Sequence, residues 1–305
     1  MKITETGRAQ WLLRVTACII AVTLPGIAVQ SRVRAADDEI VFSSSRNCNW
    51  DLWTVQVDTG TLHQLTATSR QEKSPVWSPD KKRIVFADNS GGLYIMDRDG
   101  SNARPISTGQ NVTGQPKWRP DGHAILFVSF FSQTGDTSKV YSINIDEPAG
   151  RGPELLVDRQ ALVQHPDWSP DGRHILYSMF RRGAFGEPRE ELWLRDLDAE
   201  TDTEVTRTGV QNVNASISPD GKNLVFESTL RDNADIWLLA LDEYRLTRLT
   251  EHPGYDGEPC WSPDGKRIAF VSTKDGSRAI WIMNKDGSNK KLVVKGGGDY
   301  RAPDW

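Results

Sequence analysis

The stretch PCWSPDGKRIAFVS, residues 259–272, recurs along this chain. Close copies begin at Pro75, Pro116 and Pro166, and a weaker copy begins at Ala215. In every copy, nine residues separate the Trp position from an aromatic residue in the following apolar run. The weaker copy keeps this spacing although Ile217 replaces the Trp. A spacing that survives such a replacement indicates a repeated supersecondary unit.

The centre of the repeat, Ser-Pro-Asp-Gly, predicts a tight turn between two strands. Proline fixes φ, aspartate accepts hydrogen bonds from nearby amides, and glycine accepts a positive φ. One copy departs from this pattern, because Lys81 stands where the others have glycine. The runs after the turns, such as RIAFVS, are rich in β-formers and apolar at both alternating positions, which predicts strands covered on both faces.

A third strand with a central aromatic residue and a short fourth strand follow in each unit, as in DLWTVQV and HQLT. Successive Trp positions lie 41 to 50 residues apart. Four antiparallel strands in units of this length are typical of a β-propeller blade.

Six positions correspond to the Trp of the repeat, which predicts six blades. These positions are Trp77, Trp118, Trp168, Ile217 (where Ile replaces the Trp), Trp261 and Trp305. The segment EIVFSS, residues 39–44, has the pattern of a second strand with no first strand before it, and YRAPDW, residues 300–305, supplies the missing strand. We therefore expect an all-β, six-bladed propeller over residues 37–305, closed by pairing of the C-terminal strand with the N-terminal blade. Closure of this kind removes exposed sheet edges.

WSPDG followed by an I-x-F strand resembles the TolB-type propeller repeat, which also occurs in the propellers of prolyl oligopeptidase-like peptidases. The resemblance covers nearly all of residues 39–305. It implies a propeller fold but fixes no activity, because propellers host many functions. Two features of these families are not expected here. We expect no counterpart of the N-terminal α/β domain of TolB before the propeller, and the sequence contains no G-x-S-x-G motif of the peptidases.

Residues 1–36 have the three-part pattern of a signal peptide. Lys2, Arg8 and Arg14 precede an uncharged apolar run over residues 15–29, and cleavage is expected after Ala35. The run is shorter than the roughly 20 residues that span a bilayer, although an uncleaved anchor is the alternative. A periplasmic or secreted location follows from this interpretation.

Charge and cysteine content narrow the class further. The formal net charge is −4, of which the leader contributes +4, so the remainder carries −8. This balance of charge argues against a nucleic-acid partner.

Two cysteines, Cys48 and Cys260, remain after the leader. We expect two separate buried thiols, with a disulfide as the alternative.

The connections between second and third strands differ most in length. The aromatic-to-aromatic spacing is eight residues from Phe86 to Tyr94 and 16 from Tyr177 to Trp193. Such variation on a rigid scaffold is where binding usually occurs. The two longest loops carry a candidate partner-binding set, consisting of Phe130, Phe131, Phe180, Arg181, Arg182 and Phe185. The alternative is that these aromatic rings pack against each other to hold the loops down.

A second candidate site is the mouth of the central channel, which polar residues just before each first strand are expected to line. These are Gln115, His165, Asn214, Glu258 and Arg301. They could bind a peptide, a sugar or an ion, or form a solvated wall. The five histidines are scattered, so no metal site, cofactor or catalytic group is predicted.

These observations favour a non-catalytic, monomeric binding module of the cell envelope, with a protein or peptidoglycan-associated partner. A carbohydrate-binding or sensor module is the alternative, and a metal-dependent hydrolase or lyase that uses the channel is a more distant one.

Overall fold

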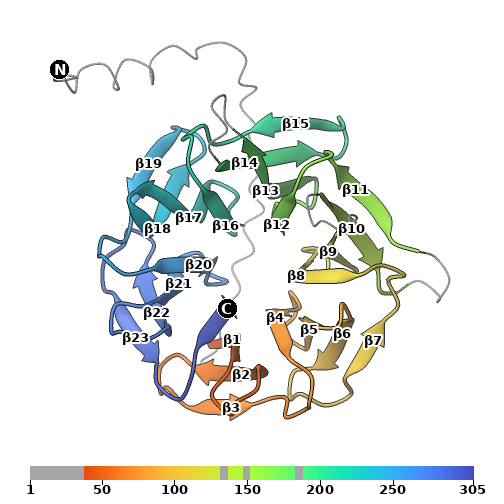
Figure 1. The fold of residues 1–305 in the computed structure, drawn as a ribbon, viewed down its shortest axis with the longest axis vertical. Coiled ribbons are helices and arrows are strands. Elements are labelled where there is room, and N and C mark those ends of the chain that lie inside the picture. The colour runs from red at the N-terminus through yellow and green to blue at the C-terminus, as the bar shows by residue number, and fades with distance from the viewer. Residues whose placement is uncertain (1–37, 131–136, 147–151, 183–187) are drawn as a thin grey trace.

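The computed structural model describes residues 38–130, 137–146, 152–182 and 188–305, apart from the side chain of residue 188. In this part of the chain, 24 strands form six four-stranded antiparallel sheets, arranged as the blades of a propeller around a central channel (Figure 1). The all-β class and the six blades are as the sequence predicts.

The first three blades, each given from the innermost strand outward, have the following bounds. Blade 1 consists of β24 (Tyr300–Asp304), β1 (Glu39–Ser44), β2 (Asp51–Gln56) and β3 (Leu62–Gln64). Blade 2 consists of β4 (Glu72–Trp77), β5 (Arg83–Asp88), β6 (Leu93–Asp97) and β7 (Arg104–Ile106). Blade 3 consists of β8 (Val112–Trp118), β9 (Ala124–Phe130), β10 (Ser138–Asn144) and β11 (Glu154–Asp158).

The other three blades follow the same order. Blade 4 consists of β12 (Val163–Trp168), β13 (His174–Arg182), β14 (Pro188–Asp196) and β15 (Thr201–Glu204). Blade 5 consists of β16 (Asn212–Ile217), β17 (Asn223–Arg231), β18 (Asn233–Ala240) and β19 (Arg245–Arg248). Blade 6 consists of β20 (Asp256–Trp261), β21 (Arg267–Ser272), β22 (Ala279–Asn284) and β23 (Lys291–Val294).

Blade 1 joins the two ends of the described chain. β24 pairs antiparallel with β1, with Ser44 opposite Tyr300 and Val41 opposite Asp304. The Trp305 indole Nε1 donates to Asp38 Oδ1 at 2.8 Å, and the Arg267 guanidinium lies 4.3 Å from the centroid of the same ring. The ring of blades is thus completed by backbone pairing and by a buried tryptophan.

The core lies between neighbouring blades. Second strands are buried along nearly their whole length, as the continuous apolar runs predict, and Phe42, Phe127 and Phe226 are almost inaccessible to solvent. Each second strand packs its two faces against the adjacent blades. Burying the ring of one such phenylalanine contributes roughly 1.5–3 kcal/mol.

Every innermost strand contains a β-bulge at the same place. In blade 2, Ser74 and Pro75 together lie opposite Phe86, and the ladder resumes at Val76. The other five innermost strands shift register at the corresponding residues. A bulge accommodates proline, which has no N–H to donate to the ladder. The Pro-x-Trp pattern therefore places a bulge on the channel wall in five of the six blades.

The antiparallel order separates the loops into two faces. The Ser-Pro-Asp turns and the Asp-Gly-Ser turns lie on one face, which we call the bottom, and connections between second and third strands lie on the opposite, top face. Ser78 Oγ donates to Asp80 Oδ1 at 2.7 Å, and Lys82 N donates to the same oxygen at 3.1 Å, which closes the turn in blade 2.

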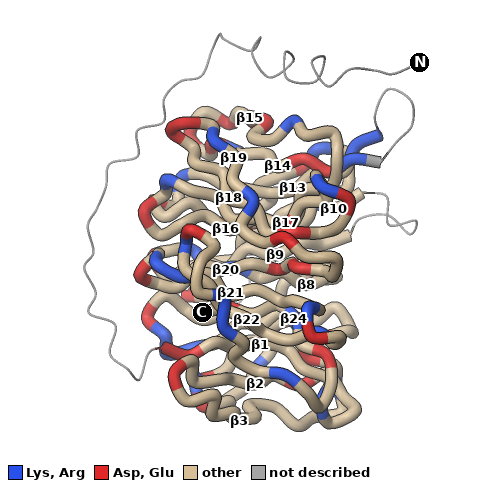
Figure 2. Tube along the Cα trace, turned by 90° about the vertical axis from the view of Figure 1, so that its left-hand side faces the viewer, with Lys and Arg blue, Asp and Glu red and all other residues tan. Residues whose placement is uncertain are grey.

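Charged residues of both signs are interspersed over the surface in the side view (Figure 2). Within the described ranges, no helix has the length and hydropathy needed to cross a membrane.

Candidate functional site

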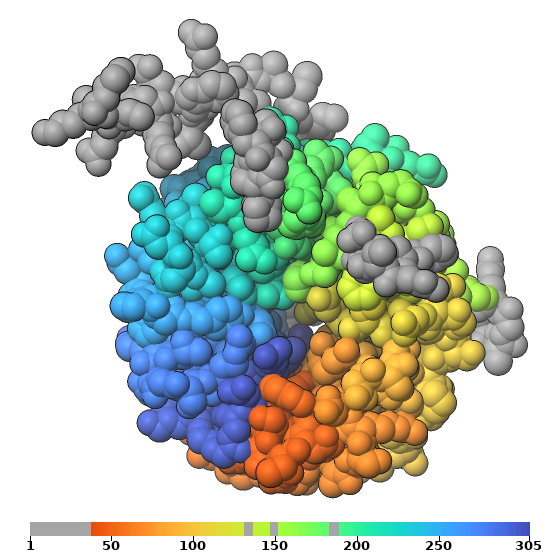
Figure 3. All heavy atoms as spheres, in the orientation of Figure 1, coloured from red at the N-terminus to blue at the C-terminus, as the bar shows by residue number. Residues whose placement is uncertain are grey.

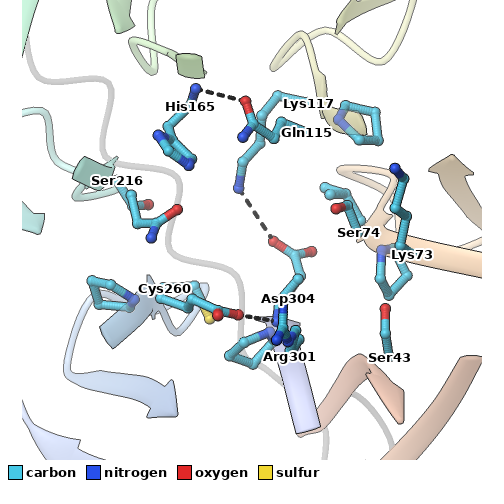
Figure 4. A pocket seen from close by; sticks show the side chains of 18 of the residues that line it. Ser43, Lys73, Ser74, Gln115, Lys117, His165, Ser216, Cys260, Arg301 and Asp304 are labelled. Atoms are coloured by element: carbon cyan, nitrogen blue, oxygen red, sulfur yellow. Dashed lines mark hydrogen bonds and ion pairs between the residues drawn. The ribbon is translucent and has the colours of Figure 1, made fainter. Parts of the chain in front are cut away.

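The central channel contains a cavity of about 490 Å³ to which all six innermost strands contribute. The hollow lies where the blades meet (Figure 3), and its lining side chains converge on the channel axis (Figure 4). All five residues predicted for the channel mouth line this cavity; they are Gln115, His165, Asn214, Glu258 and Arg301.

Two details of that prediction are wrong. These residues do not precede the first strands but lie within them, because the bulges let pairing continue past the proline. In blade 1 the bulge residue is Ala302 rather than Arg301, and Ser74 is the equivalent residue in blade 2. The bulge residues share a left-handed backbone, with φ between 47° and 59°. Non-glycine residues rarely adopt this conformation, and it concentrates at functional sites.

Side chains at the bulges connect neighbouring blades. Gln115 Oε1 accepts a hydrogen bond from His165 N at 2.7 Å, which links blade 3 to blade 4. Glu258 accepts from Ala302 N, which links blade 6 to blade 1. The contact between Gln115 and His165 is drawn in Figure 4. The polar wall therefore holds the ring together as well as facing the cavity.

His165 is the half-buried imidazole of the channel. Its Nδ1 lies 3.2 Å from Ser178 Oγ, and that hydroxyl donates to Glu190 Oε1 at 2.7 Å. Burial lowers the pKa of His165 to about 4, so the ring is neutral at pH 7. Because the single hydroxyl proton of Ser178 goes to Glu190, Nδ1 of His165 carries the proton of the imidazole, and Nε2 is the hydrogen-bond acceptor.

Blades 5 and 6 contribute two carboxylates that are already satisfied. Glu227 Oε2 accepts from Asn214 Nδ2 and from the Tyr255 hydroxyl, both at 2.9 Å. Glu258 pairs with Arg278 at 3.2 Å. Burial raises the pKa of Glu258, and it also raises the pKa of Tyr255. This wall is a closed network that presents little unpaired charge.

Deeper in the channel, a second polar group ties three blades together. Lys117 Nζ lies 3.8 Å from Asp304 Oδ1, across the channel (Figure 4). Asp304 Oδ2 also accepts from Trp77 N at 2.9 Å, and Asp167 Oδ2 accepts from Ile217 N at 3.0 Å. Burial alone would lower the pKa of Lys117, but the negative charges of Asp167 and Asp304 outweigh burial and raise it. These carboxylates therefore accept hydrogen bonds from backbone N–H groups that have no partner in their own sheet, at the channel side of the innermost strands.

The blades 1 and 2 side of the cavity presents cations instead. Lys73 lines the cavity, and its amine has no hydrogen bond or ion pair among the described residues. The Arg301 guanidinium lies 5.3 Å from the centroid of the Trp50 ring, and no carboxylate in the described part of the chain pairs with it within 4.0 Å. Two positive charges at this wall are therefore available to a ligand.

Lys81, the exception among the turns, directs its amine inward below the channel. Its φ is 59°, where glycine is favoured, and its Nζ is buried with no hydrogen-bond partner in the described part of the chain. The amine lies 5.1 Å from the centroid of the Trp77 ring. Burial lowers the pKa of Lys81 from 10.5 to about 8, although Asp304 opposes that shift. A buried amine without a hydrogen bond lowers the free energy of unfolding, and such groups are rare in folded proteins.

The top-face candidates are divided between described and undescribed residues. Phe130 ends β9 and is 37% exposed, Phe180 is half-buried in β13, and Arg182 is exposed at the end of β13. Arg181 is exposed as well, and its guanidinium stacks 4.5 Å from the centroid of Trp193 in its own blade. Phe131 and Phe185 lie outside the described residues.

The two cysteines are free and differ in exposure. Cys260 is buried in the channel wall, where burial raises the pKa of its thiol to about 12. Cys48 is exposed in the connection between β1 and β2, so the expectation of two buried thiols is wrong for this residue. Across residues 38–305, within the described ranges, no three His, Cys, Asp or Glu side chains gather in a way that could hold a metal ion.

Sequence reasoning missed three side chains that line the channel cavity, Lys73, Lys117 and Asp304, and two that support the lining residues from behind, Ser178 and Glu227. A signal for two of them was present, because Lys117 and Asp304 both lie between the Pro and the Trp of their repeats. Ser178 and Glu227 directly follow the central aromatic residue of their second strands, and only the packing of the blades brings them beside the bulges.

Comparison with known proteins agrees with this architecture. The family model described as the TolB beta propeller domain matches residues 14–135 and 127–305. The uncharacterized peptidase YuxL of Bacillus subtilis (strain 168) is 26% identical over 221 residues, which cover 71% of this chain and 31% of that protein. The chain thus spans about a third of that relative's length.

Among solved structures, TolB from Acinetobacter baumannii superposes with a TM-score of 0.76 at 19% identity, over 88% of this chain and 66% of that one. The putative TolB from Agrobacterium tumefaciens has a TM-score of 0.69 at 22% identity, over 84% and 88% of the two chains. At these identities the likeness shows the fold alone. Because the family model matches most of the residues that form the six blades, the chain belongs to the TolB beta propeller domain family.

Proposed function

We propose that this propeller is an exported, non-catalytic module that binds a protein partner of the cell envelope through its top face. The observation that supports this most directly is the pair of second-to-third-strand hairpins in blades 3 and 4. Strand β9 ends at Phe130, an exposed ring, and strand β13 ends at Arg182, an exposed guanidinium. Aromatic rings and guanidinium groups are residue types that often dominate protein interfaces.

The partner site proposed here consists of Phe130, Phe180 and Arg182, with Phe131 and Phe185 as members suggested by the sequence. Arg181 is assigned to packing, because its guanidinium already covers Trp193. Export is proposed from the signal-like leader of residues 1–36, and the family supports an envelope role. Arg182 supplies the charge that an acidic patch on the partner would pair with.

Site-specific photo-crosslinking tests this proposal. A photoreactive phenylalanine analogue at position 130 should give a defined adduct in an envelope fraction, whereas the same analogue at Asn289, on the bottom face, should not. Arg182→Glu should lower the adduct yield about tenfold or more, because losing an interfacial charge pair costs about 2 kcal/mol or more.

The matched control is Lys285→Glu, which reverses an exposed charge in a bottom-face turn. It should leave the yield unchanged. Equal adducts from positions 130 and 289, or an Arg182→Glu protein that crosslinks as well as the parent, would place the partner elsewhere.

A further inference from the structure

The channel cavity has two chemically different walls. On the blade 1 and 2 side, Lys73 and Arg301 carry positive charges without a carboxylate partner in the described part of the chain. On the blade 4 side, His165 is neutral and Nε2 of its ring has no hydrogen-bond partner among the described residues. Figure 4 shows the His165 ring and Lys73 on opposite sides of the cavity.

Among the described residues, no channel carboxylate forms an ion pair with either cation within 4.0 Å, although the charge of Arg301 acts to lower the pKa of Glu258. Glu258 is held by Arg278 and by Ala302 N, and Glu227 is held by Asn214 and Tyr255. Asp304 is engaged by Trp77 N and Lys117. A ligand with a negative group would therefore meet uncommitted cations on one side and satisfied carboxylates on the other.

The remaining lining favours a ligand with hydroxyl groups. Amide and hydroxyl side chains alternate with proline rings around the wall; they include Gln71, Ser74, Asn89, Gln115 and Asn214. The volume of about 490 Å³ lies in the range of roughly 300–1,000 Å³ that small-ligand cavities occupy. Such a space suits one or two sugar rings better than a folded partner.

We propose that the channel cavity binds a small sugar acid, with its carboxylate at the cationic wall of blades 1 and 2 and one of its hydroxyls donated to Nε2 of His165. The acceptor role of Nε2 follows from the hydrogen bond between Ser178 and Glu190, which leaves the proton of the imidazole on Nδ1. This site is separate from the top-face protein site and does not rest on the proposed function.

Isothermal titration of the purified protein at pH 7 with D-glucuronate, D-glucose and acetate tests the assignment. Glucuronate should bind at least tenfold more tightly than glucose, which lacks the carboxylate, and than acetate, which lacks the hydroxyls. No detectable glucuronate binding would overturn the proposal. Equal binding of acetate would also overturn it, because the site would then recognise a bare carboxylate.

Variants then locate the site. Lys73→Gln and Arg301→Gln, which keep polar side chains but remove the charges, should each weaken glucuronate binding about tenfold. Lys285→Gln removes an exposed charge on the bottom face and should have no effect. Arg301 is exposed at the rim, so its variant keeps the test valid even if Lys73→Gln lowers the melting temperature. Unchanged affinity in both variants would show that the sugar acid binds outside the channel.

Discussion

At the scale of single residues, Lys81 combines two unfavourable features. The four equivalent turn positions hold glycine at φ between 66° and 77°, whereas Lys81 adopts 59° with a side chain attached. Its amine is buried without a hydrogen bond in the described structure, and it is compensated by the Trp77 ring and by more distant charges, chiefly that of Asp304. An unpaired buried cation costs free energy, so the wild-type residue is not the most stable choice.

The pH dependence of stability can separate the contribution of the Lys81 amine from that of its backbone conformation. The unfolded chain protonates Lys81 near pH 10.5 and the folded protein near pH 8, so between these values the unfolded state binds more protons. The contribution of this lysine to the free energy of unfolding is therefore least favourable below pH 8, and it recovers as the pH rises towards 10.5. Lys81→Met keeps the stem and should raise the free energy of unfolding at pH 7 by about 1–3 kcal/mol.

Urea unfolding of both proteins at pH 7 and pH 10 measures this difference, which should shrink at the higher pH. Lys81→Gly is the companion variant, because it also relieves the left-handed backbone and should add roughly 1 kcal/mol. A methionine variant that is less stable than the parent at pH 7 would show that the amine has a partner that stabilises it.

At the scale of elements, the innermost strands are linked by side chains rather than by a continuous ladder. Asp304 in β24 accepts from Trp77 N at the end of β4 and also faces Lys117 in β8. Asp167 in β12 accepts in the same way from Ile217 N in β16. Because an innermost strand has an unpaired edge towards the channel, its amides need such acceptors.

Removing the Asp304 carboxylate should therefore destabilise the ring. Asp304→Ala removes the acceptor of the Trp77 amide and one of the two carboxylates that act on Lys117, and it should cost about 1–3 kcal/mol. Asp304→Asn keeps an acceptor for Trp77 N and should cost less. Lys117→Met in the Asp304→Ala background should recover part of the loss, because the ammonium that lost one of its two counter-charges is then gone. Denaturant unfolding of the double-mutant cycle measures this coupling, and strictly additive costs would contradict a shared network.

At the scale of the whole molecule, stability depends on completing blade 1. β24 supplies the innermost strand of that blade, and Trp305, which is 5% exposed, bonds to Asp38 and lies under Arg267. The residues that meet here are far apart in the sequence, so their contacts form only when all six blades are in place.

Deletion of residues 300–305 should expose the edge of β1 and the buried face of blade 1. We expect aggregation or a sharply lowered melting temperature, measured by size-exclusion chromatography and thermal unfolding. Trp305→Ala alone should cost about 3–5 kcal/mol. Tyr244→Ala, which truncates a ring that is 44% exposed on the outer rim, should leave the melting temperature unchanged. A deletion variant that stays monomeric and melts like the parent would show that blade 1 does not need β24.

Local sequence determined the blades, because each repeat carries its own turn chemistry, its continuous apolar run and a fixed nine-residue spacing. It also placed five polar residues on the channel wall, since the innermost strand of the repeat recurs once per blade. Arg301 is not equivalent to the other four residues, because it lies four residues before its Trp position and they lie three before theirs; the equivalent residue in blade 1 is Ala302.

Only the tertiary structure decided how the channel is charged. Lys117 and Asp304 are 187 residues apart in the sequence, and they approach each other because the ring brings blades 1 and 3 to a common axis. The engagement of Arg181 by Trp193 and the exposure of Cys48 likewise depend on how side chains pack above the repeats. The repeated sequence pattern specifies the backbone of each blade. Which charged side chains approach each other across the channel depends instead on the closed ring, because they belong to different blades.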